Sequence, residues 1–336
     1  MRLSVLDQST ASKGKTQDTA IRETLALAKH CDALGYYRYW VSEHHNSGNI
    51  VGTAPEVLMA AIAATTPRIR IGSAGVMLPH YSAFKVAEQF RVLEAIAPGR
   101  IDLGVGRAPG SDQLTSRALN PFPQDVHDQF PQQVQELHQW VTGSPLPDDH
   151  PFRRVIAHPT GPTFPQMWIL GSSDYGAQLA AYFGMPYAFA YFFSYGFDVD
   201  QALELYRKQY RPSALYPKPQ CTICVWALAA DTEAEALYQF KSRERALIER
   251  EHGIRQPLMS PEEAAAHELS PHEQAFSEKL RRNAVVGSVD QVVERLDALA
   301  KRLDLDELVV VTWTYDQAPR MRSYELLAQA YGLKKL

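Results

Sequence analysis

Glu43, His44 and His45 place a carboxylate beside two imidazoles, directly after a strand-like run at 36–42. In a β/α barrel, the carboxyl ends of the strands are where catalytic groups lie. These residues fit three interpretations: metal ligands, general acid–base groups, or a polar loop without catalysis. A metal site would need more ligands at other strand ends, and of the eleven histidines only His80 joins them there. We therefore expect no metal site.

Small residues mark the ends of two further predicted strands. Ala74 and Gly75 leave the end of strand 69–78 without bulk, so a flat ligand can approach the backbone, although plain barrel packing explains them equally well. Gly106 and Arg107 end the next strand, and an arginine there suits an anionic ligand or a surface salt bridge. This segment is not a dinucleotide fingerprint, because Pro109 takes the place of the third glycine.

Hydroxyl and glycine residues open the helix predicted after the fifth strand. Ser172 and Ser173 precede Tyr175 and Gly176. Free backbone N–H groups and the positive end of the helix dipole meet at such a point, which is a seat for phosphate. A serine N-cap without a ligand is the simpler alternative, and Gly287-Ser288 is a second possible phosphate seat, after the seventh strand.

Two of the three cysteines, Cys221 and Cys224, have the spacing of some redox and zinc motifs. They lie in a strand-like run, where residues three apart face opposite sides. We therefore interpret both as ordinary buried cysteines.

Strand-like and helix-like segments alternate along the whole chain, which predicts an α/β fold, a TIM (β/α)8 barrel formed as one domain by residues 1–336. The runner-up is a doubly wound open sheet, but its glycine-rich first turn is missing. Two stretches interrupt the alternation, at about 143–165 and 253–283, and we expect them to be insertion loops at the carboxyl ends of the strands. The predicted strands are 3–7, 36–42, 69–78, 101–106, 167–170, 187–191, 222–229 and 307–313.

Composition excludes several classes of protein. A net charge of −4, with no block of like charge, gives no attraction for nucleic acid or anionic lipid. The first residues predict a strand and not a signal peptide, and no apolar run is long enough to cross a bilayer. Three cysteines fit a reducing compartment, so we expect a cytoplasmic protein.

Several motifs occur in the order found in bacterial luciferase-like flavin monooxygenases, and the chain resembles that family over nearly its whole length. Three further motifs resemble an uncharacterised branch that contains antibiotic-pathway monooxygenases: Leu6-Asp7-Gln8, Pro79-His80-Tyr81 and Arg107-Ala-Pro-Gly110. The motifs shared with the whole family are Tyr39–His45, Ile71–Pro79, Ala97–Arg107, Gly171–Ser173, Leu179–Pro186 and Val286–Val292.

This resemblance implies a TIM barrel that holds reduced FMN, which reacts with O2. His44 matches the family's catalytic histidine, and its tautomer could be fixed by Glu43 or His45, although neighbours on an extended segment face opposite sides. The other matches are Ala74-Gly75 as a non-proline cis peptide under the flavin ring, Gly106 and Arg107 as ring and phosphate contacts, and Ser172, Ser173 and Gly176 as the phosphate loop.

Departures from luciferase itself concern the same site. Ser172 stands where luciferase has an acidic residue, Gly106 where it has a cysteine, and Gly110 where it has an aromatic residue. Luciferase's own substrate is therefore not implied. Aromatic residues near the strand ends indicate an apolar or aromatic small molecule, or else simply core: Phe189, Tyr191, Phe192, Phe193, Trp313 and Tyr315.

Three functions remain open. The first is a monooxygenase that receives reduced FMN from a separate flavin reductase, because no nicotinamide-binding fingerprint is present. The second is hydride transfer with the deazaflavin F420 in the same barrel. The third is a non-catalytic flavin-binding subunit, which has no need of Glu43, His44 and His45.

The helix predicted at 55–65 is apolar or small nearly all round. A barrel helix normally keeps one face in water, so this one needs cover on both sides. We expect a homodimer that packs through this helix and the helix at 82–96.

Overall fold

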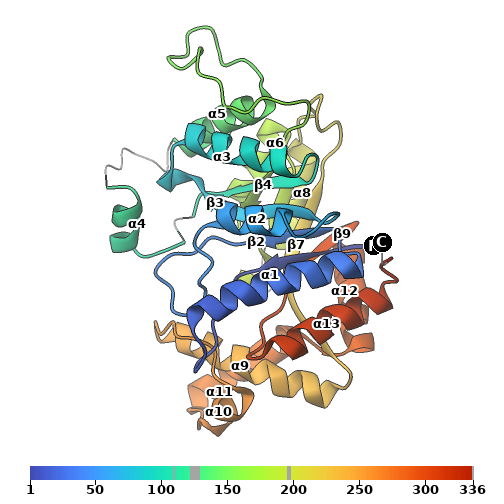
Figure 1. Ribbon diagram of the computed structural model, residues 1–336. Coiled ribbons are helices and arrows are strands. Elements are labelled where there is room, and N and C mark those ends of the chain that lie inside the picture. Colours follow the sequence, from blue (N-terminus) through green and yellow to red (C-terminus); the bar gives the residue numbers. More distant parts are fainter. Residues whose placement is uncertain (109, 122–128, 195–197, 335–336) are drawn as a thin grey trace.

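The computed structural model describes residues 1–336 except 109, 122–128, 195–197 and 335–336 (Figure 1). Eight parallel strands form a closed ring in the order β1-β2-β3-β4-β5-β6-β7-β9, and β9 pairs with β1. The predicted TIM barrel is confirmed. The barrel strands are β1 (Arg2–Asp7), β2 (Arg38–Val41), β3 (Arg70–Met77), β4 (Ile101–Gly106), β5 (Gln166–Gly171), β6 (Tyr187–Phe189), β7 (Cys221–Ala230) and β9 (Glu307–Val311).

Helices cover the outside of the ring, and local signals in the sequence set their ends. Pro55 opens one helix, the Ser82 hydroxyl accepts from the backbone of Lys85, and Gly35 ends the first helix with a φ of 88°. The helices are α1 (Gln17–Leu34), α2 (Pro55–Ala63), α3 (Ala83–Ile96), α4 (Gln113–Leu119), α5 (Phe130–Thr142), α6 (Asp174–Phe183), α7 (Tyr191–Ser194), α8 (Val199–Gln209), α9 (Glu233–Glu251), α10 (Pro261–Ala266), α11 (Pro271–Asn283), α12 (Val289–Leu303) and α13 (Gln317–Ala330).

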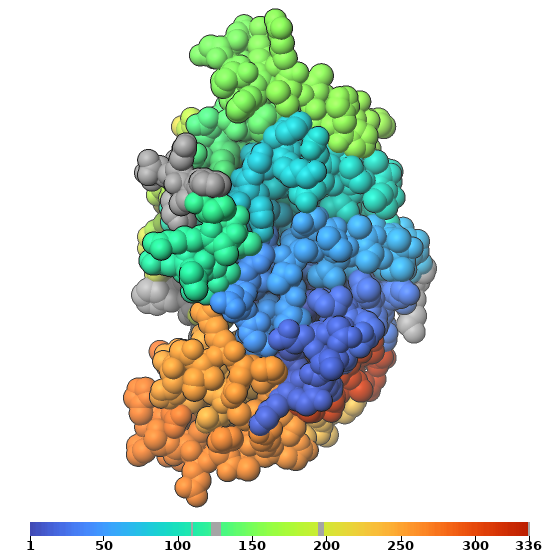
Figure 2. All heavy atoms as spheres, turned by 60° about the vertical axis from the view of Figure 1, so that its left-hand side comes forward, coloured from blue at the N-terminus to red at the C-terminus, as the bar shows by residue number. Residues whose placement is uncertain are grey.

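The insertion predicted at 253–283 is larger than expected and has structure of its own. It begins after β7 and contains α9, α10 and α11, and it ends in a ninth strand, β8 (Val285–Ser288), which pairs with the last residues of β7. The bridge between Ser12 and Leu258 ties it to the loop after β1. Figure 2 shows this orange segment against the blue N-terminal part of the chain. The insertion therefore lies at the carboxyl ends of the strands, as predicted.

The loop at 143–165 differs from the expectation. It contains no helix or strand and leads from the end of α5 into the first residue of β5. The loop therefore lies at the amino end of β5. In TIM barrels, the amino ends of the strands serve stability and not catalysis. The sequence also predicts a helix over 126–141, of which residues 126–128 lie outside the described part of the chain. Helix α5 begins at Phe130, where proline follows in the first turn.

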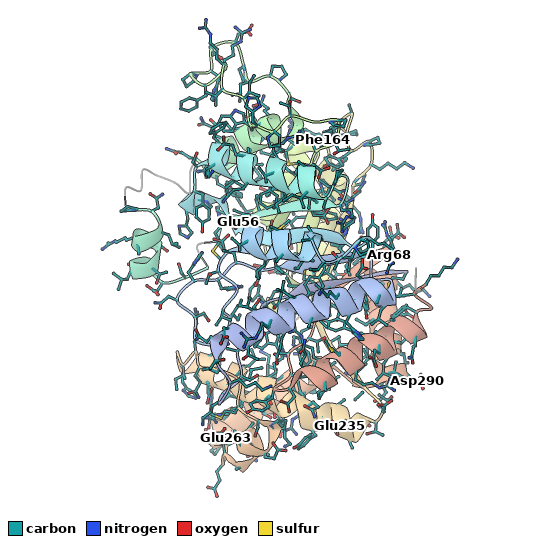
Figure 3. The ribbon with its side chains drawn as sticks, viewed as in Figure 1. Glu56, Arg68, Phe164, Glu235, Glu263 and Asp290 are labelled. Atoms are coloured by element: carbon teal, nitrogen blue, oxygen red, sulfur yellow. The ribbon has the colours of Figure 1, made fainter. Side chains whose placement is uncertain are left out.

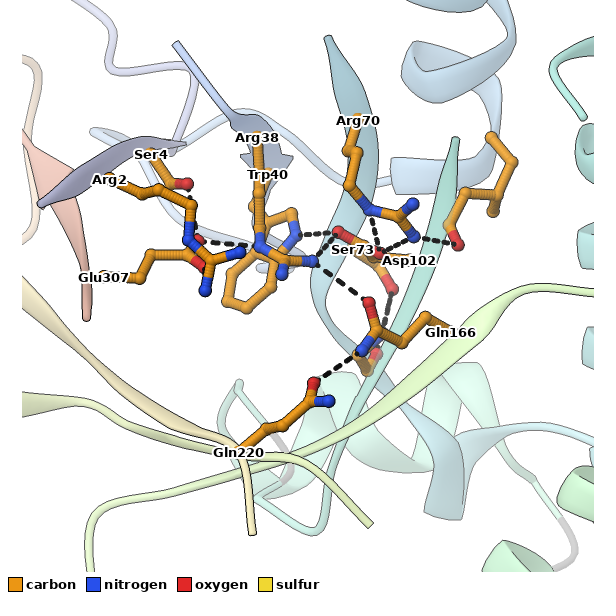
Figure 4. A network of polar contacts seen from close by, with 12 residues as sticks. Arg2, Ser4, Arg38, Trp40, Arg70, Ser73, Asp102, Gln166, Gln220 and Glu307 are labelled. Carbon is orange, nitrogen blue, oxygen red and sulfur yellow. Dashed lines mark hydrogen bonds and ion pairs between the residues drawn. The ribbon is translucent and has the colours of Figure 1, made fainter. Parts of the chain in front are cut away.

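A network of charged side chains fills the amino end of the barrel (Figure 4). The buried Arg38 guanidinium donates to Asp102 at 2.8 Å and to Glu307 at 2.7 Å, and Arg70 pairs with the other oxygen of Asp102. Above this layer, Trp40 and Trp168 pack edge to face, with ring centroids 5.3 Å apart. Side chains therefore fill the interior at the amino end of the barrel.

No helix in the described part of the chain is long and apolar enough to span a membrane. Cys31, Cys221 and Cys224 form no disulfide, and Cys224 is buried. Both Cys221 and Cys224 lie in β7, and the prediction of a buried cysteine is confirmed for Cys224, whereas Cys221 is only partly buried.

Candidate functional site

A cavity of about 330 Å³ opens at the carboxyl ends of the strands. Residues after β1, β2, β4, β6 and β9 contribute to it, and α9 of the insertion forms one wall. The lining residues are Gln8, His44, Ser47, Asn49, Ile50, Gly110, Ser111, Phe192, Phe193, Trp226, Arg243, Leu247, Arg250, Ile254, Arg255 and Trp313.

His44 lies in the wall of this cavity, on the loop after β2. Its Nδ1 is 3.1 Å from the Ser42 hydroxyl, and its backbone N–H donates to Gly52 at 3.0 Å. Burial lowers the pKa of His44 to about 4, because it outweighs the attraction of Glu43, and the charges of His45 and Arg255 add smaller effects in the same direction. His44 is therefore a neutral imidazole at neutral pH.

Glu43 and His45 turn away from His44 and form a separate cluster. His45 Nε2 is 2.8 Å from Glu43 Oε1, and the Tyr81 hydroxyl donates to the same oxygen at 2.6 Å. The other oxygen of Glu43 accepts from the backbone N–H of Met77 at 3.1 Å. These contacts hold the end of β3 against the loop after β2. The tautomer of His44 is thus influenced by Ser42, a residue that the sequence did not single out, and not by hydrogen bonds from Glu43 or His45.

Some of the aromatic residues named from the sequence line the cavity, and others lie elsewhere. Phe192, Phe193 and Trp313 line the cavity. Phe189 is fully buried in the core, whereas the Tyr315 hydroxyl donates to the Lys13 backbone outside the lining.

Among the lining residues that the sequence analysis did not identify are Trp226, Arg243 and Gln8. The side-chain oxygen of Gln8 accepts a hydrogen bond from Trp313 Nε1 at 3.0 Å. Trp226 lies inside a long apolar strand, and Arg243 lies among many charged residues of one helix. Neither has a local signal that distinguishes it from its neighbours. Gln8 directly follows the first strand, and this position at a strand end is the signal from which it could have been identified as a site residue.

The ends of β3 and β4 approach each other closely around small residues. The peptide bond between Ala74 and Gly75 is cis, as predicted. A Cβ at Gly75 would lie 2.8 Å from the Gly104 carbonyl oxygen, so this contact requires glycine. A Cβ at Gly106 would meet nothing within 4 Å, so the end of β4 borders open space.

The helix N-terminus after β5 is open. Ser172 and Ser173 are exposed, and the Ser173 side chain makes no capping hydrogen bond to α6. The Asp174 carboxylate accepts from Gln201 at 2.7 Å, so it is engaged by α8. The Arg107 guanidinium stacks 3.9 Å above the Tyr175 ring, which brings a cation from the end of β4 to this helix. Gly176 is buried, and a Cβ there would lie 3.3 Å from the Tyr187 ring.

The alternative phosphate seat, at Gly287-Ser288, is closed by its own side chains. The Ser288 hydroxyl accepts from the backbone of Gln291, and the Gln291 side chain accepts from the backbone of Ser288 at 2.9 Å. A Cβ at Gly287 would lie 2.4 Å from Gln291 Oε1. This capping box engages the backbone N–H groups of Ser288 and Gln291, which an anion at this helix would otherwise bind.

The candidate residues therefore occupy two parts of one rim. Ala74, Gly75 and Gly106 lie in the second halves of β3 and β4, whereas Arg107 and the Ser172–Gly176 turn follow β4 and β5. None of these residues lines the cavity. The cavity is built mainly at the ends of β1, β2, β6, β7 and β9, on the other side of the ring.

A parallel β/α barrel with polar residues gathered at the carboxyl ends of its strands has the architecture of a TIM-barrel enzyme. This chain belongs to the luciferase-like monooxygenase family, which matches residues 1–305. A luciferase-like monooxygenase of Escherichia coli (strain K12) is 38% identical over 323 residues, which cover 96% of this chain and 95% of the relative. The N-acetyl-S-alkylcysteine monooxygenase of Bacillus subtilis (strain 168) is 35% identical over 332 residues, 98% of each chain. The solved structure of apo-MsnO8 has a TM-score of 0.89 and 34% identity, covering 99% of this chain and 98% of that one.

Proposed function

We propose that this protein is a flavin-dependent monooxygenase that oxidises an apolar or aromatic small molecule with O2 and reduced FMN, supplied by a separate reductase. The observation that carries the proposal is that two different regions lie at the carboxyl ends of the strands. One is a cavity with aromatic residues and the neutral His44, and the other is the open N-terminus of α6 with Arg107 beside it. The two regions match the two things such an enzyme must hold, a substrate and a flavin phosphate.

The residues after β3, β4 and β5 fit FMN. The exposed Ser172 and Ser173 and the free N–H groups of α6 suit a phosphate, with Arg107 beside them. The open space at Gly106 gives a flat ring access to the backbone at the end of β4. Bound reduced FMN would supply the electrons that activate O2.

His44 is the acid–base group in this proposal. The Ser42 hydroxyl engages Nδ1, which leaves Nε2 as the ring nitrogen that can exchange a proton with a ligand. A neutral imidazole accepts a proton, and burial disfavours the protonated form, so His44 can return the proton. Glu43 and His45 hold the loop in place and touch no ligand in this scheme.

The choice of FMN over F420 rests on the family, because solved barrels of this fold bind either one. The oxygenating constituent of 3,6-diketocamphane monooxygenase was solved with FMN, and a secondary alcohol dehydrogenase with an F420 adduct, at 20% and 14% identity. These identities support the fold alone.

Binding and isotope transfer separate the three candidate functions. We expect reduced FMN to bind more tightly than reduced F420 when both are titrated anaerobically and followed by fluorescence. With isotopically heavy O2 and a panel of alkyl and aryl compounds, one heavy oxygen atom should enter the product. Tighter binding of reduced F420, with a product that carries no heavy oxygen, would instead identify a hydride-transfer enzyme. Flavin binding without any turnover would identify a non-catalytic subunit.

A further inference from the structure

The charged residues in the cavity wall all carry the same sign. Arg243 and Arg250 come from α9, and Arg255 follows it in the insertion. Among the described lining residues there is no aspartate or glutamate. Because His44 is neutral, three guanidinium groups dominate the electrostatic potential of this cavity.

The acidic residues of α9 near these arginines are engaged elsewhere. Glu249 accepts from Arg245 at 3.0 Å and from Gln256 at 2.8 Å. Glu244 accepts from Ser277 and Arg281 of α11, at 2.7 and 2.6 Å. These two carboxylates of α9 are thus paired away from the cavity, whereas Arg243 and Arg250 of the same helix line it. Glu263, labelled in Figure 3, likewise pairs with Lys13 at the outer edge of the insertion.

Arg243 is the most buried of the three cations, with 3% of its surface exposed. Its guanidinium lies 4.0 Å above the Trp226 ring and 5.9 Å from the Trp313 ring. Stacking on the ring fixes the orientation of the guanidinium plane. Because the N–H groups lie in this plane, they suit bidentate binding of a carboxylate.

Apolar side chains make up much of the remaining lining. They are Phe192, Phe193, Ile50 and Leu247, together with Trp226 and Trp313. A ligand that satisfies both the cationic and the apolar residues has an anionic head and an apolar or aromatic body. About 330 Å³ is room for a small molecule of this kind and not for a polymer.

We propose that the substrate is a small amphiphilic carboxylic acid, whose carboxylate is bound by Arg243 and Arg255 and whose apolar part packs against Trp226, Trp313 and Phe192. The proposal rests on the proposed function only in assigning the cavity to the substrate. It is tested by binding, which needs neither reduced flavin nor O2, so that its failure is separate from failure of the monooxygenase activity.

Matched pairs of acids and amides test the charge preference in the unaltered protein. The probes are 3-phenylpropanoate against 3-phenylpropanamide, and octanoate against octanamide, titrated by calorimetry with and without saturating oxidised FMN. We expect the acid of at least one pair to bind about tenfold or more tightly than its amide, because a charge-assisted contact replaces a neutral one. Equal binding within both pairs, or no binding of any probe, would overturn the proposal.

Three variants locate the contact. Arg243→Met and Arg255→Gln should each weaken binding of the preferred acid about tenfold and leave binding of its amide and of FMN unchanged. Arg245→Met is the matched control, because it removes a guanidinium from the same helix outside the cavity lining. Arg255 is exposed, so its substitution remains informative even if Arg243→Met does not fold. Equal loss of FMN binding in the Arg243 and Arg255 variants would assign these arginines to the cofactor and refute the proposal.

Discussion

At the scale of the residue, three neighbours in the sequence have two different roles. His44 borders the cavity, while Glu43 and His45 bind each other and Tyr81. Extended backbone explains the division, since successive side chains leave on opposite sides. A cluster of catalytic residue types therefore contains one group that can reach a ligand and two that position it.

Substitution of His44 should affect turnover and leave binding intact. We expect His44→Gln to lower kcat by about 10²–10⁴, the usual contribution of positioned proton transfer, with FMN affinity unchanged. The measurement is steady-state oxidation of a substrate found with labelled O2. His45→Gln is the matched control, and its effect should come through stability, because it loses only the contacts with Glu43 and Tyr81. Full activity in His44→Gln would make His44 a structural residue.

The low pKa of His44 also predicts a dependence of stability on pH. Its pKa is about 4 in the folded chain and about 6.5 in the unfolded chain, so between these values the unfolded chain binds more protons. As the pH falls through this window, the free energy of unfolding should drop by about 1.4 kcal/mol per pH unit relative to His44→Gln.

Urea unfolding of both proteins at several pH values measures this difference. Above pH 6.5 the difference between them should be constant. A difference that stays constant down to pH 4 would contradict a buried, neutral His44. Arg255→Gln should move the titration of the His44 ring upward, as followed by NMR, because Arg255 opposes its protonation.

At the scale of the element, two helices that begin with serine differ in what their N-termini can bind. The N-terminus of α12 is closed by the Ser288–Gln291 capping box, whereas the first turn of α6 has no side-chain cap. Gln291 lies three residues after the cap, at the position that completes a capping box. In α6 the same position holds Gly176, which has no side chain.

This difference makes the site of the flavin phosphate testable. Ser173→Asp places a carboxylate where the phosphate is expected, so FMN should bind at least tenfold more weakly. Ser288→Asp makes the same change at the capped helix and should leave FMN binding within twofold. The dissociation constant of FMN, measured by fluorescence quenching, compares the two. The reverse order of effects would move the phosphate to α12.

At the scale of the whole molecule, the outer faces of α2 and α3 expose apolar side chains. Val57 is 64% exposed, Val92 47% and Ile96 49%. The two helices are joined by a hydrogen bond from Gln89 to Glu56 at 3.2 Å (Figure 3 labels Glu56). Exposed apolar side chains on two adjacent helices indicate an interaction site.

We therefore predict a homodimer that buries this surface. Val57→Glu and Val92→Glu should each shift the molar mass by light scattering at micromolar concentration from two chains to one. Leu237→Glu, at an exposed leucine of α9, is the control and should leave the mass unchanged. A monomer in the unaltered protein would refute the prediction.

The sequence by itself determined the barrel, because alternating strands and helices with clear caps allow few other arrangements. Gly35, Pro55 and Ser82 act through backbone geometry and local hydrogen bonds, so their effects can be predicted without tertiary contacts. The cis bond at Ala74-Gly75 was predicted from a motif shared with the family, and not from local physics.

Only the tertiary structure decided what surrounds His44. The insertion after β7 brings Arg243 and Arg255 to a histidine some two hundred residues earlier in the chain, and no periodic pattern encodes a distance of that kind. The loop at 143–165 is a different case, because it follows a predicted helix and precedes a predicted strand, and that order already assigns it to the amino ends of the strands. Local patterns fix elements, whereas the electrostatics of a site depend on which elements the closed ring brings together.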